Sequence, residues 1–490
     1  MNPMLIVLVI FLYFLMLVLI SFRTSKGANN ASFFIGGHKS PWYLVAFGMI
    51  GASLSGVTFI SIPGWVGTSQ FAYLQTVLGY LVGYAVIANV LMPMYYRLNL
   101  TSIYTYLDQR FGVASYKTGA AFFLLSRTIG ASFRMFLVAN VLQFIIFDSM
   151  GIPFWVTVVI TLMLIWLYTY RGGIKTIVYT DVIQTVFMLA SVLITIYIIG
   201  DHLDWNFSQM VSGISESNYS KIFFFEDSNS SDYFWKHFIG GAFIAICMTG
   251  LDQDMMQKNL SCKNIGEAKK NMFWFSSALV VVNLLFLSLG ALLYLYCENM
   301  QITLPLKSDN LYPMLAMSGD LGTLLPIVFV LGLIAAAYSS ADSALTALTT
   351  SFCIDIISIE KKYESQEKKE NVRKLVHLGM SGVMFISILI FKSLNNESVI
   401  KELFTIAGYT YGPLLGLYAF GMFTKITIKD KFVPFVCIVS PIICYIVNSN
   451  SVEWFNGYKF GFELLLLNGM LTFAGLMMLR KKEVNTLSKD

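Results

Sequence analysis

Oxygen-bearing side chains gather on one face of a short apolar segment, residues 335–343. At 100° per residue along an α-helix, one face about 160° wide holds Ala336, Ser339, Ser340, Asp342 and Ser343. Three hydroxyls and a carboxylate give a hard cation several oxygen ligands, and sodium prefers oxygen as other hard cations do. The pattern therefore predicts a sodium site. The alternative is a serine-rich face used only for close helix packing.

A second segment carries a buried cation that suits an organic anion. Arg134 lies near the centre of the apolar run 117–147, where a charge is costly enough that function is the default hypothesis. The planar guanidinium fork matches a carboxylate. We therefore predict that the solute is a carboxylate. The alternative is a neutral sugar or polyol, with Arg134 acting as an internal counter-ion.

Asp342 has three candidate roles. Arg127 and Asp342 both lie about 6–8 Å to the cytoplasmic side of their helix centres, at 1.5 Å per residue. Because an intramembrane charge usually has a partner, we predict a structural ion pair between them. Asp342 as a sodium ligand or as a proton site are the two alternatives.

The elements that position these residues must cross a membrane. The chain has 490 residues, 56% hydrophobic and only 12% charged, with a mean hydropathy of +0.68. A soluble fold could not bury that much apolar surface. Apolar runs near the ~20 residues needed to span a bilayer are 4–21, 42–63, 71–99, 117–147, 153–170, 176–199, 236–257, 270–297, 320–356, 373–392, 396–423, 432–449 and 459–480. We expect an all-α membrane protein with about thirteen transmembrane helices.

Charge distribution sets the expected orientation. The first run is followed by Arg23 and Lys26, which places the N-terminus outside. With that start, 25 of the 33 Lys and Arg fall in cytoplasmic loops and the tail, as the positive-inside rule requires. We expect a multi-pass protein of the inner or plasma membrane with a cytoplasmic C-terminus. The four histidines lie at or beyond helix ends and no catalytic motif is evident, so we do not expect an enzyme.

Two spans contain residues that favour an interrupted helix. Residues 48–58 concentrate glycine, serine and threonine, and residues 247–253 place an amide and an acid within an apolar run. Irregular backbone at this depth is tolerated only around a cavity, although Gly and Ser also serve close packing. The breaks fall in core helices 1 and 6, equivalent positions of two inverted five-helix repeats. The predicted divisions of this single domain are a peripheral helix (4–21), two repeats (42–199 and 236–424) and two peripheral C-terminal helices (432–480).

Five separated motifs carry a resemblance to a known family. They are residues 51–63; Arg171-Gly172-Gly173 with 180–184; Gln253 with Gln257-Lys258; residues 335–343; and residues 412–416 with Gly421. From about Phe33 to Lys425 the chain resembles the sodium/solute symporter family, which includes sodium-coupled sugar, proline, iodide and sialic acid carriers. The resemblance implies a LeuT-like fold of five plus five helices and sodium as the coupling ion.

The resemblance also implies ligands for sodium. A first site would use the backbone carbonyls of Gly51, Leu54 and Ala336 and the hydroxyls of Ser339 and Ser340. A second cation site, found in some relatives, would use Asp181, Ser339, Asp342 and Ser343. Here the carboxylate of Asp342 stands where relatives have a hydroxyl.

The nearest resemblance is to the bacterial sodium/sialic acid symporters. Arg134 matches their carboxylate-binding arginine, and Ser53, Ser55 and Thr58 match hydroxyl positions around it, while an assisting glutamine aligns with Val77. Gln253 is also expected to contact the solute. We therefore predict sodium-coupled uptake, by alternating access, of a small polar solute, a carboxylate such as a sugar acid, sialic acid or monocarboxylate. The expected partners are that solute, sodium and the lipid bilayer; neither nucleic acid nor an obligate protein partner is implied.

Overall fold

The computed structural model describes residues 3–27, 29–394 and 399–481, and the regular elements within these ranges are helices. The main helices are α1 (Pro3–Thr24), α3 (Trp42–Ser53), α4 (Gly56–Ser69), α5 (Tyr73–Val86), α8 (Val113–Leu142), α9 (Phe154–Thr169), α10 (Ile174–His202), α12 (Phe234–Ala245), α13 (Gln253–Leu260), α14 (Ile265–Asn299), α16 (Leu324–Ser351), α18 (Gln366–Leu394), α19 (Val399–Phe423), α20 (Val433–Ser449) and α22 (Leu464–Met478). Shorter α-helices are α2 (Asn30–Ile35), α6 (Met92–Arg97), α7 (Thr105–Arg110), α11 (Phe207–Glu216), α15 (Leu311–Ser318), α17 (Ile359–Lys362) and α21 (Ser451–Trp454). Helical turns of other pitch are η1 (Gly36–His38), η2 (Ile87–Leu91), η3 (Gln143–Phe147), η4 (Asp148–Met150), η5 (Ile246–Gly250), η6 (Ser308–Asn310), η7 (Phe352–Ile356) and η8 (Asp430–Phe432).

The all-α architecture predicted from the sequence is confirmed. By length and composition, eight described helices are apolar enough to cross a membrane, or ten if each of two bent pairs is one span. Two shorter apolar helices, α9 and α22, lie at predicted spans. The predicted count of thirteen stays a prediction, since residues 396–398 of one predicted span lie outside the described residues, as does the predicted tail beyond 481. In lipid, helices form over such runs because every backbone amide must bond within its own segment.

The first predicted break exists. Helices α3 and α4 are bent by 56° at their junction, where Leu54 (φ −88°, ψ 90°) and Ser55 (φ −81°, ψ 177°) are extended. A small residue is required beside the break, because a Cβ on Gly56 would lie 2.4 Å from the Val138 side chain of α8. Close contact with α8 therefore depends on glycine here.

The second predicted break is also present. The helix formed by α12 and η5 meets α13 at a bend of 65°. Asp252 is extended at the bend, and its side chain accepts a hydrogen bond from the backbone amide of Asp254. This local cap replaces a helical bond and begins α13.

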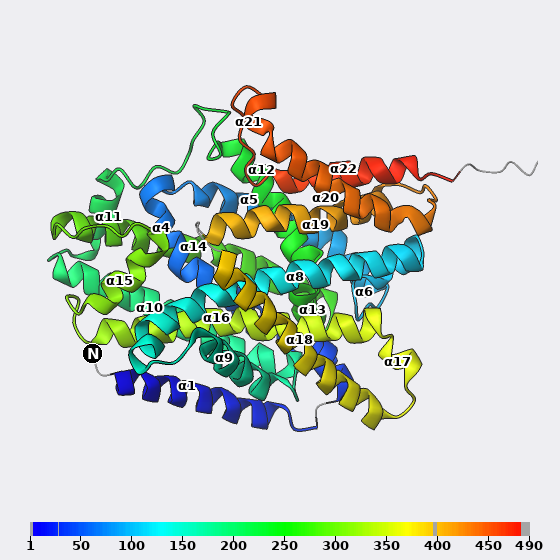
Figure 1. Ribbon diagram of the computed structural model, residues 1–490, viewed down its shortest axis with the longest axis horizontal. Coiled ribbons are helices and arrows are strands. Elements are labelled where there is room, and N and C mark those ends of the chain that lie inside the picture. The colour runs from blue at the N-terminus through cyan, green and yellow to red at the C-terminus, as the bar shows by residue number, and fades with distance from the viewer. Residues whose placement is uncertain (1–2, 28, 395–398, 482–490) are drawn as a thin grey trace, which may run out of the picture.

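Helix α16 packs in the middle of the bundle, against the first interrupted pair, α3 and α4. α16 contacts α10, α8 and α4, and 83% of its most apolar window is buried, against 22% for α1. Figure 1 shows α1 along one edge of the bundle, with α20 and α22 toward the opposite edge. The assignment of residues 4–21 and 432–480 as peripheral helices stays a prediction. The division into two inverted repeats stays a prediction.

Candidate functional site

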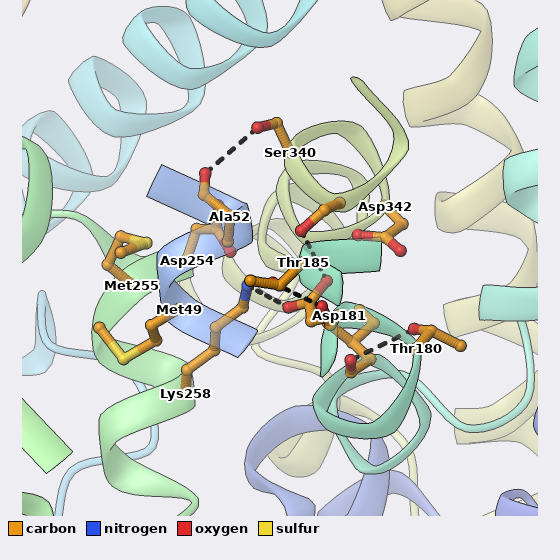
Figure 2. A network of polar contacts seen from close by, with 12 residues as sticks. Met49, Ala52, Thr180, Asp181, Thr185, Asp254, Met255, Lys258, Ser340 and Asp342 are labelled. Carbon is orange, nitrogen blue, oxygen red and sulfur yellow. Dashed lines mark hydrogen bonds and ion pairs between the residues drawn. The ribbon is translucent and has the colours of Figure 1, made fainter. Parts of the chain in front are cut away.

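The break between α3 and α4 faces the hydroxyl-bearing side of α16. The Ser340 hydroxyl donates a hydrogen bond of 3.1 Å to the carbonyl of Ala52 (Figure 2). A Cβ on Gly51 would lie 3.3 Å from the Ser339 hydroxyl oxygen. The structure thus brings together the broken backbone and both serines of the predicted first sodium site, with Ala336 buried on the same helix.

The break between α3 and α4 also leaves backbone carbonyls without helical hydrogen bonds. The Leu54 amide bonds the Ile50 carbonyl at the end of α3, and the Phe59 amide bonds the Ser55 carbonyl at the start of α4. Carbonyls of residues 51–54 therefore lie where the helical hydrogen-bond ladder is interrupted. Such carbonyls, with serine hydroxyls, are the neutral oxygen donors that suit a monovalent hard cation.

Asp181, predicted for a second cation site, is already paired. Lys258 Nζ of α13 lies 2.6 Å from one carboxylate oxygen, and the Ser339 hydroxyl donates a 2.9 Å hydrogen bond to the other. Figure 2 shows Lys258 reaching toward Asp181 from the helix after the second break. Sequence reasoning missed this pair, although Lys258 was among the family motifs. The available signal was a lysine one residue beyond the predicted span 236–257, where a charge near the membrane calls for a counter-charge.

Asp342 lies near that pair but makes no hydrogen bond to it, and its carboxylate is only partly bonded by the described residues. The Tyr168 hydroxyl of α9 donates a 2.8 Å hydrogen bond to its Oδ2. Its Oδ1 and the hydroxyl of the adjacent Ser343 have no hydrogen-bond partner. Both side chains are fully buried, so an acceptor and a hydroxyl remain open to a cation.

The predicted ion pair between Arg127 and Asp342 is wrong. Arg127 of α8 instead pairs with Asp254, and its guanidinium lies 3.9 Å from Asp252. The Tyr411 hydroxyl of α19 donates a 2.5 Å hydrogen bond to Asp252 as well. Equal depth suggested the pair with Asp342, but Arg127 faces the second break. The resulting network joins α8, α13 and α19.

Gln253 does not line the candidate substrate cavity, which corrects a second prediction. Its amide donates a 2.8 Å hydrogen bond to the carbonyl of Thr101 and accepts a 3.0 Å bond from the amide of Ile103. Both bonds go to the backbone that precedes α7. Gln253 therefore ties α13 to this loop, and its hydrogen-bonding capacity is already committed.

A cavity of about 80 Å³ lies beside the first break. Its wall includes Ser53, Ser55, Thr58 and Arg134, so these four predicted residues meet at one place. Within the described ranges no carboxylate lies within 4.0 Å of the Arg134 guanidinium, and its Nε is buried without a hydrogen-bond partner. The cavity thus holds a cation that lacks a close counter-charge.

Other wall residues escaped the sequence analysis. They are Tyr73, Tyr80 and Tyr84 of α5, Thr249 of η5 and Asn283 of α14. Tyr73 and Tyr80 bond each other through their hydroxyls at 3.0 Å. Val77, which aligns with an assisting glutamine of relatives, is buried and is not part of the wall. A polar residue inside a span was the available signal for Asn283.

The site suits an alkali cation better than a transition metal. In the described part of the chain, no three His, Cys, Asp or Glu side chains form a metal-binding group. The donors that converge on the first break are hydroxyls and carbonyls. This donor set can take up and release a weakly held cation, as transport requires.

Comparison with known proteins identifies the family and the fold. The model of the sodium:solute symporter family matches residues 33–429. The sodium/sialic acid symporter NanT of Aliivibrio fischeri is 26% identical, over 92% of this chain and 88% of its own. SiaT of Proteus mirabilis, named for the same activity, is 26% identical over 85% of this chain and 84% of its own. A solved structure described as the substrate-bound outward-open state of a Na⁺-coupled sialic acid symporter has a TM-score of 0.81 at 22% identity, and the match covers 97% of this chain and 98% of that one.

Proposed function

Because this chain belongs to the sodium:solute symporter family, we propose that it imports a small organic carboxylate together with sodium by alternating access. Membership makes the chain a membrane transporter rather than an enzyme, with sodium as the coupling ion and a small molecule as the solute. These predictions are confirmed. The carboxylate and the orientation, with the N-terminus outside and the C-terminus in the cytoplasm, belong to the proposal.

The observation that carries the proposal is Arg134, which lies in the wall of the cavity and has no carboxylate within 4.0 Å among the described residues. Arg134 is half-buried, and a guanidinium partly removed from water within a membrane-spanning helix is costly unless an anion meets it. The neighbouring Arg127 does not share this need, because Asp254 already pairs with it. A carboxylate is the planar anion that a guanidinium fork binds best. Sialic acid, for which two relatives are named, is itself a carboxylate.

One broken segment serves both binding events. Gly51 and Leu54 would offer carbonyls to sodium on the α16 side, together with Ala336, Ser339 and Ser340. Ser53 and Ser55 of the same segment line the solute cavity. Sodium binding would hold this non-helical backbone in one conformation and orient the serine hydroxyls for the solute. Coupling would then follow from shared geometry rather than from direct contact between ion and solute.

The alternative of a neutral sugar or polyol is less consistent with the site. It requires an internal counter-ion for Arg134, yet no described carboxylate lies within 4.0 Å. A neutral solute would leave the guanidinium uncompensated during every transport cycle. We therefore retain the carboxylate as the proposed solute class.

Uptake into proteoliposomes with an inward sodium gradient tests the proposal. The panel is N-acetylneuraminate, gluconate, 3-hydroxybutanoate and glucose, each compared with a potassium gradient. Arg134→Gln should raise the KM for a transported carboxylate about 10- to 100-fold, because a charge-assisted hydrogen bond is lost. The exposed Arg23 provides the control, and Arg23→Gln should leave KM unchanged. Sodium-driven uptake of glucose without uptake of any carboxylate would contradict the proposal.

A further inference from the structure

The wall of the cavity contributed by α14 holds a buried amide with one unused atom. Asn283 is 2% exposed and belongs to the cavity wall. Its Nδ2 donates a 2.8 Å hydrogen bond to the carbonyl of Leu279, one turn earlier on the same helix. Within the described part of the chain, its Oδ1 has no hydrogen-bond partner.

The orientation of this amide is fixed by its own helix. If the group were flipped, Oδ1 would face the carbonyl oxygen of Leu279, and two acceptors would repel each other. The bond from Nδ2 to Leu279 therefore leaves Oδ1 as the free atom. A buried acceptor without a donor destabilises the site until a donor reaches it. Asn283 thus favours a ligand that brings a hydroxyl or N–H group.

The remaining polar side chains of the wall do not impose this requirement. Hydroxyls such as those of Thr249 and Tyr84 donate or accept as the ligand demands, and Tyr73 and Tyr80 bond each other. An amide oxygen only accepts. Arg134, on the same cavity, only donates. The cavity wall therefore contains a hydrogen-bond donor, Arg134, that suits an anion, and an acceptor, Asn283, that suits a donor.

We propose that Asn283 is a specificity residue that accepts a hydrogen bond from the transported anion, so that the solute is a hydroxy- or amino-substituted carboxylate rather than a plain alkyl carboxylate. This inference rests on the proposed function, in which Arg134 holds the carboxylate group. It adds a second point of recognition from α14, a helix that the sequence analysis did not assign to the solute.

The test compares butanoate with 2-, 3- and 4-hydroxybutanoate, which share one carbon skeleton and differ by one hydroxyl. Sodium-dependent uptake, or inhibition of the uptake of a larger hydroxylated acid such as gluconate or N-acetylneuraminate, is measured for the wild type, Asn283→Leu and Asn299→Leu. Asn299 is a matched control, because its Nδ2 also bonds the carbonyl one turn earlier, Leu295, while the residue is exposed.

We expect the wild type and Asn299→Leu to prefer at least one hydroxybutanoate over butanoate about tenfold, as one net hydrogen bond allows. In Asn283→Leu this ratio should fall to about one. Because both ligands are compared in the same protein preparation, lower expression or stability of a variant does not affect the ratio. Purified protein with the same ligands in a sodium-dependent thermal shift gives the ratio without transport.

Two outcomes overturn the inference. In the first, the wild type shows no preference for any hydroxybutanoate over butanoate. In the second, the preference for a hydroxybutanoate persists in Asn283→Leu. Either would leave sodium-driven carboxylate uptake intact. Failure of the proposed function is a different result, in which no carboxylate of any kind moves with sodium.

Discussion

Replacing Lys258 with methionine tests whether the pair between Asp181 and Lys258 stabilises the core. The ammonium lies 2.6 Å from the carboxylate, and the two side chains are 2% and 1% exposed, so solvent screens the pair little. Removing one partner of a buried ion pair costs about 3–5 kcal/mol, because the other charge is left uncompensated. We therefore expect Lys258→Met to shift the unfolding equilibrium about a hundred- to several-thousandfold. Adding Asp181→Asn to Lys258→Met should regain most of the loss.

Equilibrium unfolding in detergent, followed by tryptophan fluorescence, measures these differences. Lys374→Met is the control, because its ammonium lies 3.8 Å from Glu370 and the two side chains are 40% and 36% exposed. An exposed pair of this kind contributes about 0–1 kcal/mol. Equal losses in the two lysine variants would refute the reasoning. So would a double variant no more stable than Lys258→Met, because the penalty would then not come from the stranded carboxylate.

Three further predictions concern the sodium sites and the break. Ser340→Ala should raise the sodium concentration for half-maximal uptake about tenfold through loss of one ligand, while Ser381→Ala, which removes a bond within α18, should not. Gly56→Ala places a methyl group 2.4 Å from the Val138 side chain and should lower the free energy of unfolding by about 1–3 kcal/mol. Adding Val138→Ala should restore this stability, and a failure to do so would place the strain elsewhere. If Asp342 holds a second sodium, Asp342→Ala should lower the sodium-to-solute ratio by one in paired tracer fluxes, and an unchanged ratio would exclude Asp342 as a sodium ligand.

The helical fold and its interruptions could be predicted because they depend on local composition. A run of Gly, Ser and Thr inside an apolar segment weakens a helix wherever it packs, so residues 48–58 indicated a break before any partner was known. Asp252 acted the same way at the second break, as a residue that caps a new helix. The hydroxyl face of α16 followed from helical periodicity alone. These features are set within one helix.

Partners between helices could not be predicted in the same way. The position of a residue along its span gives its depth, and depth matched Arg127 with Asp342. Depth does not give the direction in which a side chain points, and Arg127 faces Asp254 on α13. Gln253 was assigned to the solute from a family motif, which also does not give the direction of the side chain, and it bonds the backbone before α7. Asn283 stands out as a polar residue inside a span, but the sequence does not show that it lies in the wall of the cavity.

The charged side chains in the core bear on how strongly the carrier can accumulate its solute. Asp254 balances Arg127 and Lys258 balances Asp181, whereas Arg134 and Asp342 have no ion pair within 4.0 Å among the described side chains. One sodium with a monoanion moves no net charge, so a tenfold sodium gradient, about 1.4 kcal/mol, supports only about tenfold accumulation. A second sodium at Asp342 would move one net charge and add about 3.7 kcal/mol at 100 mV, raising the limit to several thousandfold. A carboxylate for a second sodium, together with an arginine for the anion, is therefore the arrangement that the proposed carrier of a scarce organic acid would require.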